Sequence, residues 1–105
     1  MTKTLRGAVI ELSGGNVRNS HFYLRGMPWL PKSTVGGTSE SEVAAEALEV
    51  TFCNGAVIST DIAGDKMILR NREAVGRFFS DIGAVEGTRI IVEQTGPRSI
   101  NVSKR

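Results

Sequence analysis

Two short segments of this sequence combine positive charge with side chains that both donate and accept hydrogen bonds. They are Asn16–His21 (NVRNSH) and Thr60–Lys66 (TDIAGDK). Arginine can form a bidentate pair with guanine, asparagine can do so with adenine, and aspartate can accept from the amino group of cytosine. Serine, threonine and lysine commonly contact phosphates. The segments therefore contain the chemistry for recognising a nucleic acid, although composition alone favours the simpler interpretation of two solvated turns.

The residues that follow the first segment extend its polar surface. In the stretch His21–Met27 polar and apolar residues alternate, which places Tyr23 and Arg25 on the same face as His21. Arg25 there either reaches a phosphate or lies along the surface with its aliphatic stem packed.

Charged residues in and after the second segment each have two interpretations. Asp61 and Asp65 either accept from a cytosine amino group or orient nearby arginines, and capping of the local turn is an equally good structural role. Arg70 and Arg72 flank the start of a predicted helix, where positive charge opposes the helix dipole. This indicates an external anion unless the neighbouring Glu73 balances the charge. The candidate contact residues are Arg18, Asn19, Ser20, His21, Tyr23, Arg25, Thr60, Asp61, Asp65, Lys66 and Arg70.

Catalytic and metal-binding residue types are sparse. The chain has one His and one Cys, and it contains no His–Cys zinc motif. Ser20, His21 and Asp61 supply the residue types of a hydrolytic triad, but nothing in their spacing supports that geometry. Asp61, Asp65 and Lys66 match a metal-dependent nuclease site only loosely. We therefore expect no catalytic residue, metal site or cofactor in this chain.

The remaining sequence predicts the elements that position these segments, most of them short strands. Asn54-Gly55 between two apolar stretches predicts a hairpin with a type I′ turn. Ser13–Asn16 is predicted as a turn, and so is 95–97. The predicted strands are Leu5–Leu12, His21–Met27, Leu48–Cys53, Ala56–Ile62, Lys66–Leu69, Thr88–Gln94 and Ser99–Ser103.

One helix is clearly predicted and two other stretches have weaker helical signals. Asn71 is a good N-cap, and Gly83 is a good C-terminal stop. Pro31–Val35 fits a short helical turn. Thr38–Glu49 is either a helix capped by Ser39 or Ser41, or a loose acidic loop. The residues assigned to the core or its edge are Val75, Phe78, Phe79 and Ile82 on the main helix, with Phe22, Trp29 and Phe52.

Length and composition limit the class of protein. A chain of 105 residues with 40% hydrophobic residues forms one domain, residues 1–105. No apolar run approaches the roughly 18 residues of a membrane helix, and the N-terminus lacks a secretion signal. Cys53 is the only cysteine and lies among apolar strand residues, which predicts a buried structural thiol. These features favour a cytoplasmic protein without membrane association.

Charge is unevenly distributed along the chain. There are 13 Lys and Arg residues and 11 Asp and Glu residues, a net charge of +2. Residues 38–49 contain four acidic residues and no basic one, so the rest of the chain is more basic than the net charge suggests. A basic body of this kind fits a polyanionic partner, and the acidic stretch is expected to project as a loop or helix.

The order of the motifs adds a resemblance to a known family. A strand ending in Glu-Leu leads into a polar segment, an apolar strand and a Pro-Lys pair within Glu11–Gly37 (ELSGGNVRNSHFYLRGMPWLPKSTVGG). A Gly-x-Val strand, a polar arm, a helix with aromatics and a last long strand follow within Asn54–Gln94. This order, over residues 5–103, resembles the plant B-three DNA-binding domain and, still more, the effector domains of some type IIE restriction endonucleases.

The resemblance implies a fold and a mode of action. The expected fold is mostly β (α+β), a seven-stranded open pseudobarrel with one or two short helices. In that family two arms enter the major groove of DNA; here the N-arm corresponds to Ser13–His21 and the C-arm to Thr60–Lys66. These contain the two segments that composition had already indicated.

The leading hypothesis is therefore sequence-specific binding of double-stranded DNA. The domain would act as a regulator, or as the effector or targeting domain of a restriction enzyme with a nuclease domain or partner chain. A second hypothesis is a protein-interaction β-barrel that uses the acidic stretch or a hairpin edge. A third is a small hydrolase or nuclease, which requires metal-dependent cleavage by this chain alone.

Overall fold

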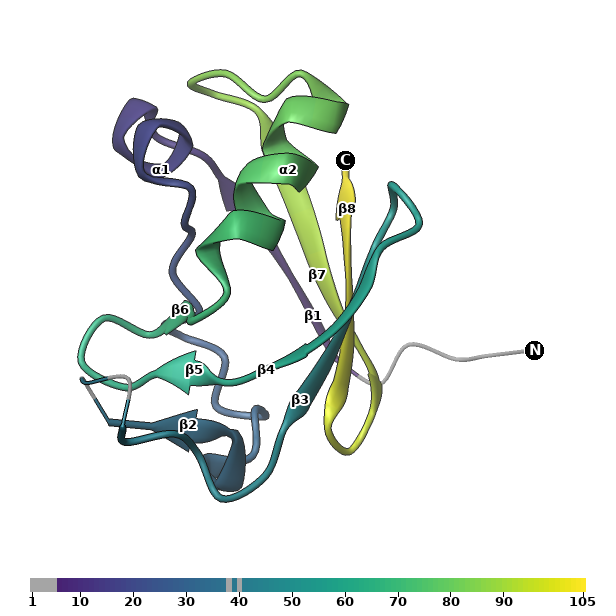
Figure 1. The fold of residues 1–105 in the computed structure, drawn as a ribbon. Coiled ribbons are helices and arrows are strands. Elements are labelled where there is room, and N and C mark those ends of the chain that lie inside the picture. The colour runs from purple at the N-terminus through teal and green to yellow at the C-terminus, as the bar shows by residue number, and fades with distance from the viewer. Residues whose placement is uncertain (1–5, 38, 40) are drawn as a thin grey trace.

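Strands of alternating apolar residues form two sheets in the computed structural model, which describes residues 6–37, 39 and 41–105. The larger sheet has the order β1-β7-β8-β3-β4 and the smaller one β2-β5-β6 (Figure 1). The elements are β1 (Gly7–Glu11), α1 (Gly14–Asn19), the 3-10 turn η1 (Lys32–Thr34), β2 (Val35–Gly36), β3 (Leu48–Phe52), β4 (Val57–Thr60), β5 (Ile62–Ala63), β6 (Ile68–Leu69), α2 (Arg72–Ile82), β7 (Arg89–Gly96) and β8 (Ser99–Lys104).

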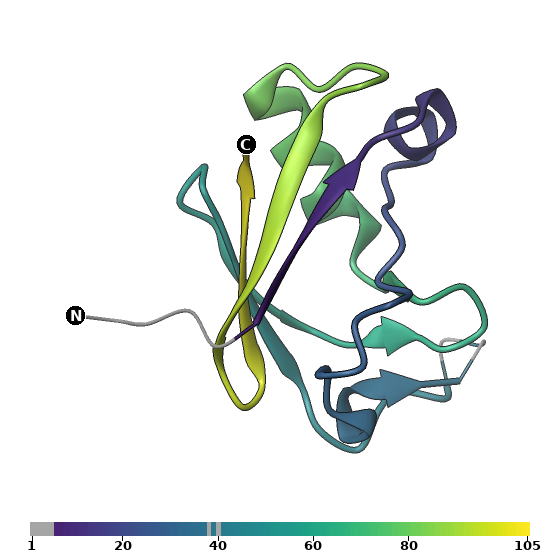
Figure 2. The same ribbon diagram turned by 180° about the vertical axis from the view of Figure 1, so that it is seen from behind.

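The larger sheet contains both the first and the last strand of the described chain. β1 pairs antiparallel with β7, so that Val9 lies opposite Ile91. β8 lies between β7 and β3, antiparallel to the first and parallel to the second. Figure 2 shows this order from behind, with β1 beside β7. The mostly β, α+β class expected from the sequence is confirmed, with strands in mixed sheets and two α-helices in the described part of the chain.

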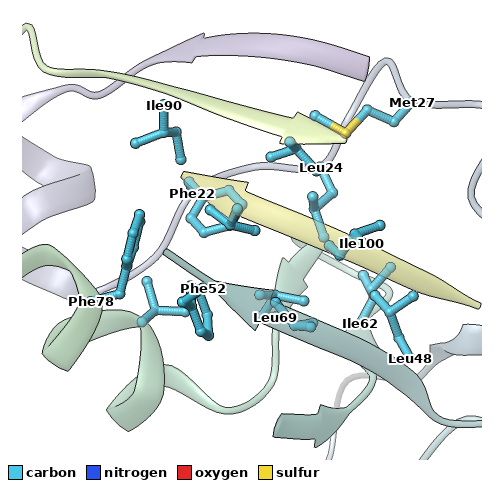
Figure 3. Packing of buried hydrophobic residues seen from close by; sticks show 14 of the residues in the cluster. Phe22, Leu24, Met27, Leu48, Phe52, Ile62, Leu69, Phe78, Ile90 and Ile100 are labelled. Carbon is cyan, nitrogen blue, oxygen red and sulfur yellow. The ribbon is translucent and has the colours of Figure 1, made fainter. Parts of the chain in front are cut away.

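The hydrophobic core fills the space between the larger sheet, α2 and the segment that follows α1. Leu48, Val50 and Phe52 of β3 are at most 1% exposed, because alternate residues of a strand point to the same face. The rings of Phe52 and Phe78 are 4.9 Å apart between centroids, which fixes α2 over the sheet (Figure 3). Phe22 and Leu24, from the segment after α1, belong to the same core cluster.

The prediction for the main helix is confirmed at both ends. The side chain of Asn71 accepts a hydrogen bond from the Ala74 N–H, and Gly83 ends the helix with φ of 65°. The residues assigned to the core are buried or half-buried as expected: Phe22, Phe52, Val75, Phe78, Phe79, Trp29 and Ile82.

The prediction of a strand over His21–Met27 is wrong. The alternation itself is real, because Phe22 and Leu24 are buried whereas Tyr23 and Arg25 are exposed. However, no strand in the described part of the chain pairs with this segment. Its Leu24 N–H instead donates to the Met67 carbonyl, 2.7 Å away, in the turn between β5 and β6. An alternating pattern shows only that one face of a segment is buried. Here a segment that packs against the core without a strand partner has that pattern.

The predicted turn at Ser13–Asn16 is also wrong, because this stretch begins α1. The Ser13 side chain accepts from the Asn16 N–H, and the Asn16 side chain accepts from the Ser13 N–H. Such a reciprocal capping box satisfies backbone donors at the start of a helix, which offsets the low helix propensity of Gly14 and Gly15.

The hairpin at Asn54-Gly55 is confirmed, but its turn is not type I′. Gly55 has φ of 95°, while Asn54 is not among the described residues with positive φ. The Phe52 carbonyl accepts from the Gly55 N–H, and the Phe52 N–H donates to the Ala56 carbonyl. These two hydrogen bonds close a three-residue loop. Cys53 is the first residue of that loop and is exposed, so the predicted buried thiol is wrong.

The acidic stretch 38–49 contains no helix in its described part, and Glu49 lies in β3. Thr38 and Glu40, like Leu5 at the start of the first predicted strand, lie outside the described residues. The stretch does not project as expected, because backbone hydrogen bonds connect it to the preceding segment. The Glu46 N–H donates to the Ser33 carbonyl, and the Gly37 N–H donates to the Glu42 carbonyl.

Other boundaries differ by a few residues. The stretch predicted as one strand over Ala56–Ile62 is split into β4 and β5, and β6 begins at Ile68. β7 continues to Gly96, so the last turn falls at Pro97 and Arg98. No helix in the described ranges combines the length and hydrophobicity that a membrane-spanning segment requires.

Candidate nucleic-acid interface

The two polar segments meet on one side of the molecule. In Figures 1 and 2, α1, the segment after it and the β5–β6 turn follow the same side of the fold. The Leu24 N–H contacts the Met67 carbonyl of that turn. His21 is close enough to Lys66 and Arg72 to experience both charges. The fold therefore brings residues near 20 and near 66 into one surface.

Most of the predicted N-arm is helical. α1 ends at Asn19, and the following C-cap residue Ser20 has a left-handed φ of 53°. Arg18 and Asn19 are exposed on its last turn. The Asn19 side-chain amide donates to the Gly15 carbonyl at 2.9 Å, so bidentate pairing of Asn19 with adenine would require this bond to break.

Arg72 connects the two helices. Its Nε donates to the Asn19 carbonyl at 3.0 Å, and its Nη2 donates to the same oxygen. The last carbonyls of a helix lack intrahelical partners and carry partial negative charge, so a cation is favourable there. This contact explains why an arginine lies at the start of α2, where the helix dipole disfavours positive charge. Arg18, Asn19, Ser20, Arg72 and Glu73 line an open depression between the helices.

His21 lies next to this junction. Burial lowers the pKa of His21, and the positive charges of Arg72 and Lys66 lower it further. Its Nδ1 is buried and has no hydrogen-bond partner within the described part of the chain. Protonation would therefore place an N–H where no acceptor is available, and the neutral imidazole is favoured near pH 7.

His21, Tyr23 and Arg25 stack along the outer face of the segment after α1. The rings of His21 and Tyr23 have centroids 5.2 Å apart. The guanidinium carbon of Arg25 lies 4.6 Å from the centroid of the Tyr23 ring. Tyr23 is 38% exposed, so this stack borders solvent.

The predicted C-arm is divided between exposed and internal residues. Asp65 and Lys66 are exposed in the β5–β6 turn. Thr60, at the end of β4, accepts a hydrogen bond from the Asn71 N–H at 3.2 Å. Asp61 is only 7% exposed. The arm that faces solvent is therefore the turn at 64–67, and the earlier residues support it from below.

Asp61 and Arg70 form a clasp beneath this turn. Arg70 Nε lies 2.7 Å from Asp61 Oδ1, and Arg70 Nη2 lies 3.1 Å from Oδ2. Arg70 also donates to the carbonyls of Gly37 and Ser39, and the Ala44 N–H donates to Asp61. Burial raises the pKa of Asp61, but the hydrogen bonds from Arg70 and Ala44 and the charge of Arg70 outweigh it, so the pKa is lowered. Of the sequence interpretations of Asp61, which are a cytosine contact, an arginine partner and a cap of the turn, the one with an arginine partner matches these contacts.

The candidate residues therefore separate into two groups. Asp61, Arg70 and Thr60 hold the backbone in place through internal hydrogen bonds. The rest are exposed or half-exposed: Arg18, Asn19, Ser20, His21, Tyr23, Arg25, Asp65 and Lys66. Within the described ranges, no group of three His, Cys, Asp or Glu residues is placed to hold a metal ion.

Neither a scan of protein families nor a search of curated proteins identifies a relative. No protein-family model matches this sequence. A search of curated proteins found no significant match either.

Proposed function

We propose that this domain binds double-stranded DNA in a sequence-specific manner. The observation that carries the proposal is the convergence of α1, the segment 20–25 and the β5–β6 turn on one side of the fold, with the Leu24–Met67 hydrogen bond between them. Arg18, Arg25 and Lys66 supply exposed positive charge there. Such charge supplies affinity by neutralising phosphates, while side chains at the groove edge supply specificity.

In this proposal, the two arms enter the major groove as they do in B-three-like domains. The two sheets then correspond to the open pseudobarrel of that family, and the clasp of Asp61 and Arg70 supports the second arm. Arg18, Asn19 and His21 read bases from the first arm, while Lys66 contacts a phosphate. The domain does not cleave DNA itself. It acts in the cytoplasm as a regulator, or as the targeting domain of a restriction enzyme with its nuclease domain or partner.

One surface feature favours a second candidate, a protein-interaction module. β4 is an edge of the larger sheet, and Val57 on it is 60% exposed. Ala56 and Ile58 line a groove against α2 beside it. An extended peptide can add to such an edge through backbone hydrogen bonds.

Binding to a random pool of duplex oligonucleotides tests both candidates. DNA binding predicts enrichment of a common sequence, preference for duplex over single strands, and an affinity that falls severalfold or more from low to physiological salt. Absence of enrichment, preference for single strands or a flat salt response would contradict the proposal. Retention of DNA binding when Val57→Lys blocks the β4 edge would separate this function from peptide binding.

A further inference from the structure

The stack of His21, Tyr23 and Arg25 presents one cation in a defined orientation. The three side chains alternate with the buried Phe22 and Leu24 along the segment, and the Arg25 guanidinium carbon lies 4.6 Å from the Tyr23 ring centroid. The backbone below is anchored by Phe22 and Leu24, which are 1% and 0% exposed, and by the Leu24–Met67 hydrogen bond. The position of Arg25 is therefore set by the core as well as by the ring.

The Arg25 guanidinium keeps its donors available. No hydrogen bond or ion pair to it is found within the described part of the chain, in contrast to Arg70 and Arg72, which both bind carbonyls. Packing of a guanidinium against an aromatic ring leaves its N–H groups in the plane, directed outward. A pre-organised fork loses less entropy when it pairs with a planar acceptor than a freely rotating side chain does.

We infer that Arg25 reads a guanine in the major groove and that Tyr23 is the positioning residue that holds it for this contact. The inference rests on the proposed function and specifies the chemistry of one part of that surface. Guanine O6 and N7 form a planar pair of acceptors that matches the guanidinium fork. A phosphate can also accept both donors of a guanidinium fork, so a phosphate contact is the alternative that the test must distinguish.

The test uses the duplex selected from the random pool, with each guanine replaced singly by 7-deazaguanine, which has a C–H in place of N7. For the wild-type protein, one replacement should weaken binding about tenfold. Arg25→Ala should weaken binding by a similar factor and make that position insensitive to the replacement. Arg25→Lys keeps the charge but lacks the planar fork, so it should retain binding to scrambled DNA and show a smaller sensitivity to the guanine replacement than the wild type.

Tyr23 is tested in the same assay. Tyr23→Leu should remove the guanine sensitivity, whereas Tyr23→Phe, which keeps the ring, should preserve it. Because Tyr23 is 38% exposed, both variants should melt near the wild-type temperature.

Three results would overturn the inference while leaving DNA binding intact: a selected site without guanine, an Arg25→Ala loss that is equal for all sequences, or a Tyr23→Leu variant with unchanged guanine sensitivity. The second result would identify a phosphate contact. Absence of any duplex binding would instead overturn the proposed function together with the inference.

Discussion

The guanidinium of Arg70 lies against the carboxylate of Asp61 in a two-point contact, with N–O distances of 2.7 and 3.1 Å. The same guanidinium donates to the carbonyls of Gly37 and Ser39, so one side chain joins β2, the acidic stretch and the base of the second arm. Both side chains are largely withdrawn from solvent, at 18% and 10% exposed. The pair therefore determines how the second arm is supported.

Arg70→Ala should destabilise the fold by roughly 3 kcal/mol, because it leaves the Asp61 carboxylate buried without its partner. Arg70→Lys should recover only part of this loss, since a single ammonium cannot reproduce the two-point contact. Urea denaturation measures the difference. An unchanged denaturation midpoint for Arg70→Ala would show that the clasp contributes nothing to stability.

Acid should weaken the fold through Asp61. The folded-state pKa of this carboxyl is lowered, so at acidic pH the unfolded chain binds more protons than the folded one. The stability from this group is present above the unfolded pKa of about 4, and it is lost as the pH falls through the folded value. Asp61→Asn should be less stable at neutral pH and show a flatter pH profile. Parallel acid profiles of both proteins would contradict this assignment.

Substitutions in the two arms should have different effects on binding. Arg18→Ala and Asn19→Ala should reduce discrimination between the selected site and a scrambled one, because a bidentate base contact contributes roughly 1–3 kcal/mol. Lys66→Ala should weaken binding to both sequences about equally, since a phosphate contact carries no base information. Binding isotherms for both duplexes measure this.

Arg98→Ala is the matched control for loss of one positive charge, because Arg98 lies in the turn between β7 and β8 and pairs with Glu46. It should leave binding nearly unchanged. If Arg18 and Asn19 prove neutral while a substitution in the acidic stretch abolishes function, the two-arm mechanism is wrong and the interaction module takes its place.

Phe78→Ala should affect stability and not recognition. Phe78 is 0% exposed and packs on Phe52, so its truncation should cost roughly 3–5 kcal/mol. The neighbouring Arg77 is exposed, and Arg77→Ala should stay within about 0.5 kcal/mol of the wild type. Thermal melts of both variants provide the comparison. A small shift for Phe78→Ala would mean that α2 is not held by this contact.

The chain alone should leave duplex DNA intact in the presence of magnesium or manganese. Asp61 is one of the two aspartates that loosely match a nuclease site. Its carboxylate already accepts hydrogen bonds from Arg70 and from the Ala44 N–H. Incubation of pure protein with duplex DNA and either metal tests this. Cleavage that copurifies with the protein and disappears in Asp61→Ala would establish an enzyme instead.

Elements with local signals could be predicted from the sequence, whereas those that depend on distant partners could not. α2 has its cap and stop within its own sequence, and the turn at Gly55 lies between two alternating stretches. The segment His21–Met27 has the alternation of a strand, but pairing depends on a neighbour that the fold does not supply. The sequence does not predict α1, because Gly14 and Gly15 oppose a helix, although Ser13 and Asn16 carry its capping signal.

The candidate site shows the same division. The exposed positions of Arg18 and Lys66 follow from their polar surroundings. The burial of Asp61 could not be predicted from its surroundings in the sequence, because its partner Arg70 comes close only when β5 and β6 pair. The sequence shows that Arg72 opposes the dipole of α2, but it does not show the partner, because the Asn19 carbonyl is 53 residues away in the sequence.

The place of β8 within the larger sheet also determines when this domain can acquire its structure. β8 follows all other strands in the sequence, yet it lies between β7 and β3. A ribosome therefore delivers β3 well before, and β7 immediately before, the strand that joins them, and each presents an unpaired edge until β8 pairs with it. The fold closes in one late step, and a domain that lacks residues 99–104 should be open along its middle. That strand, supplied as a separate peptide, should restore the sheet by pairing with β7 and β3 at the same time.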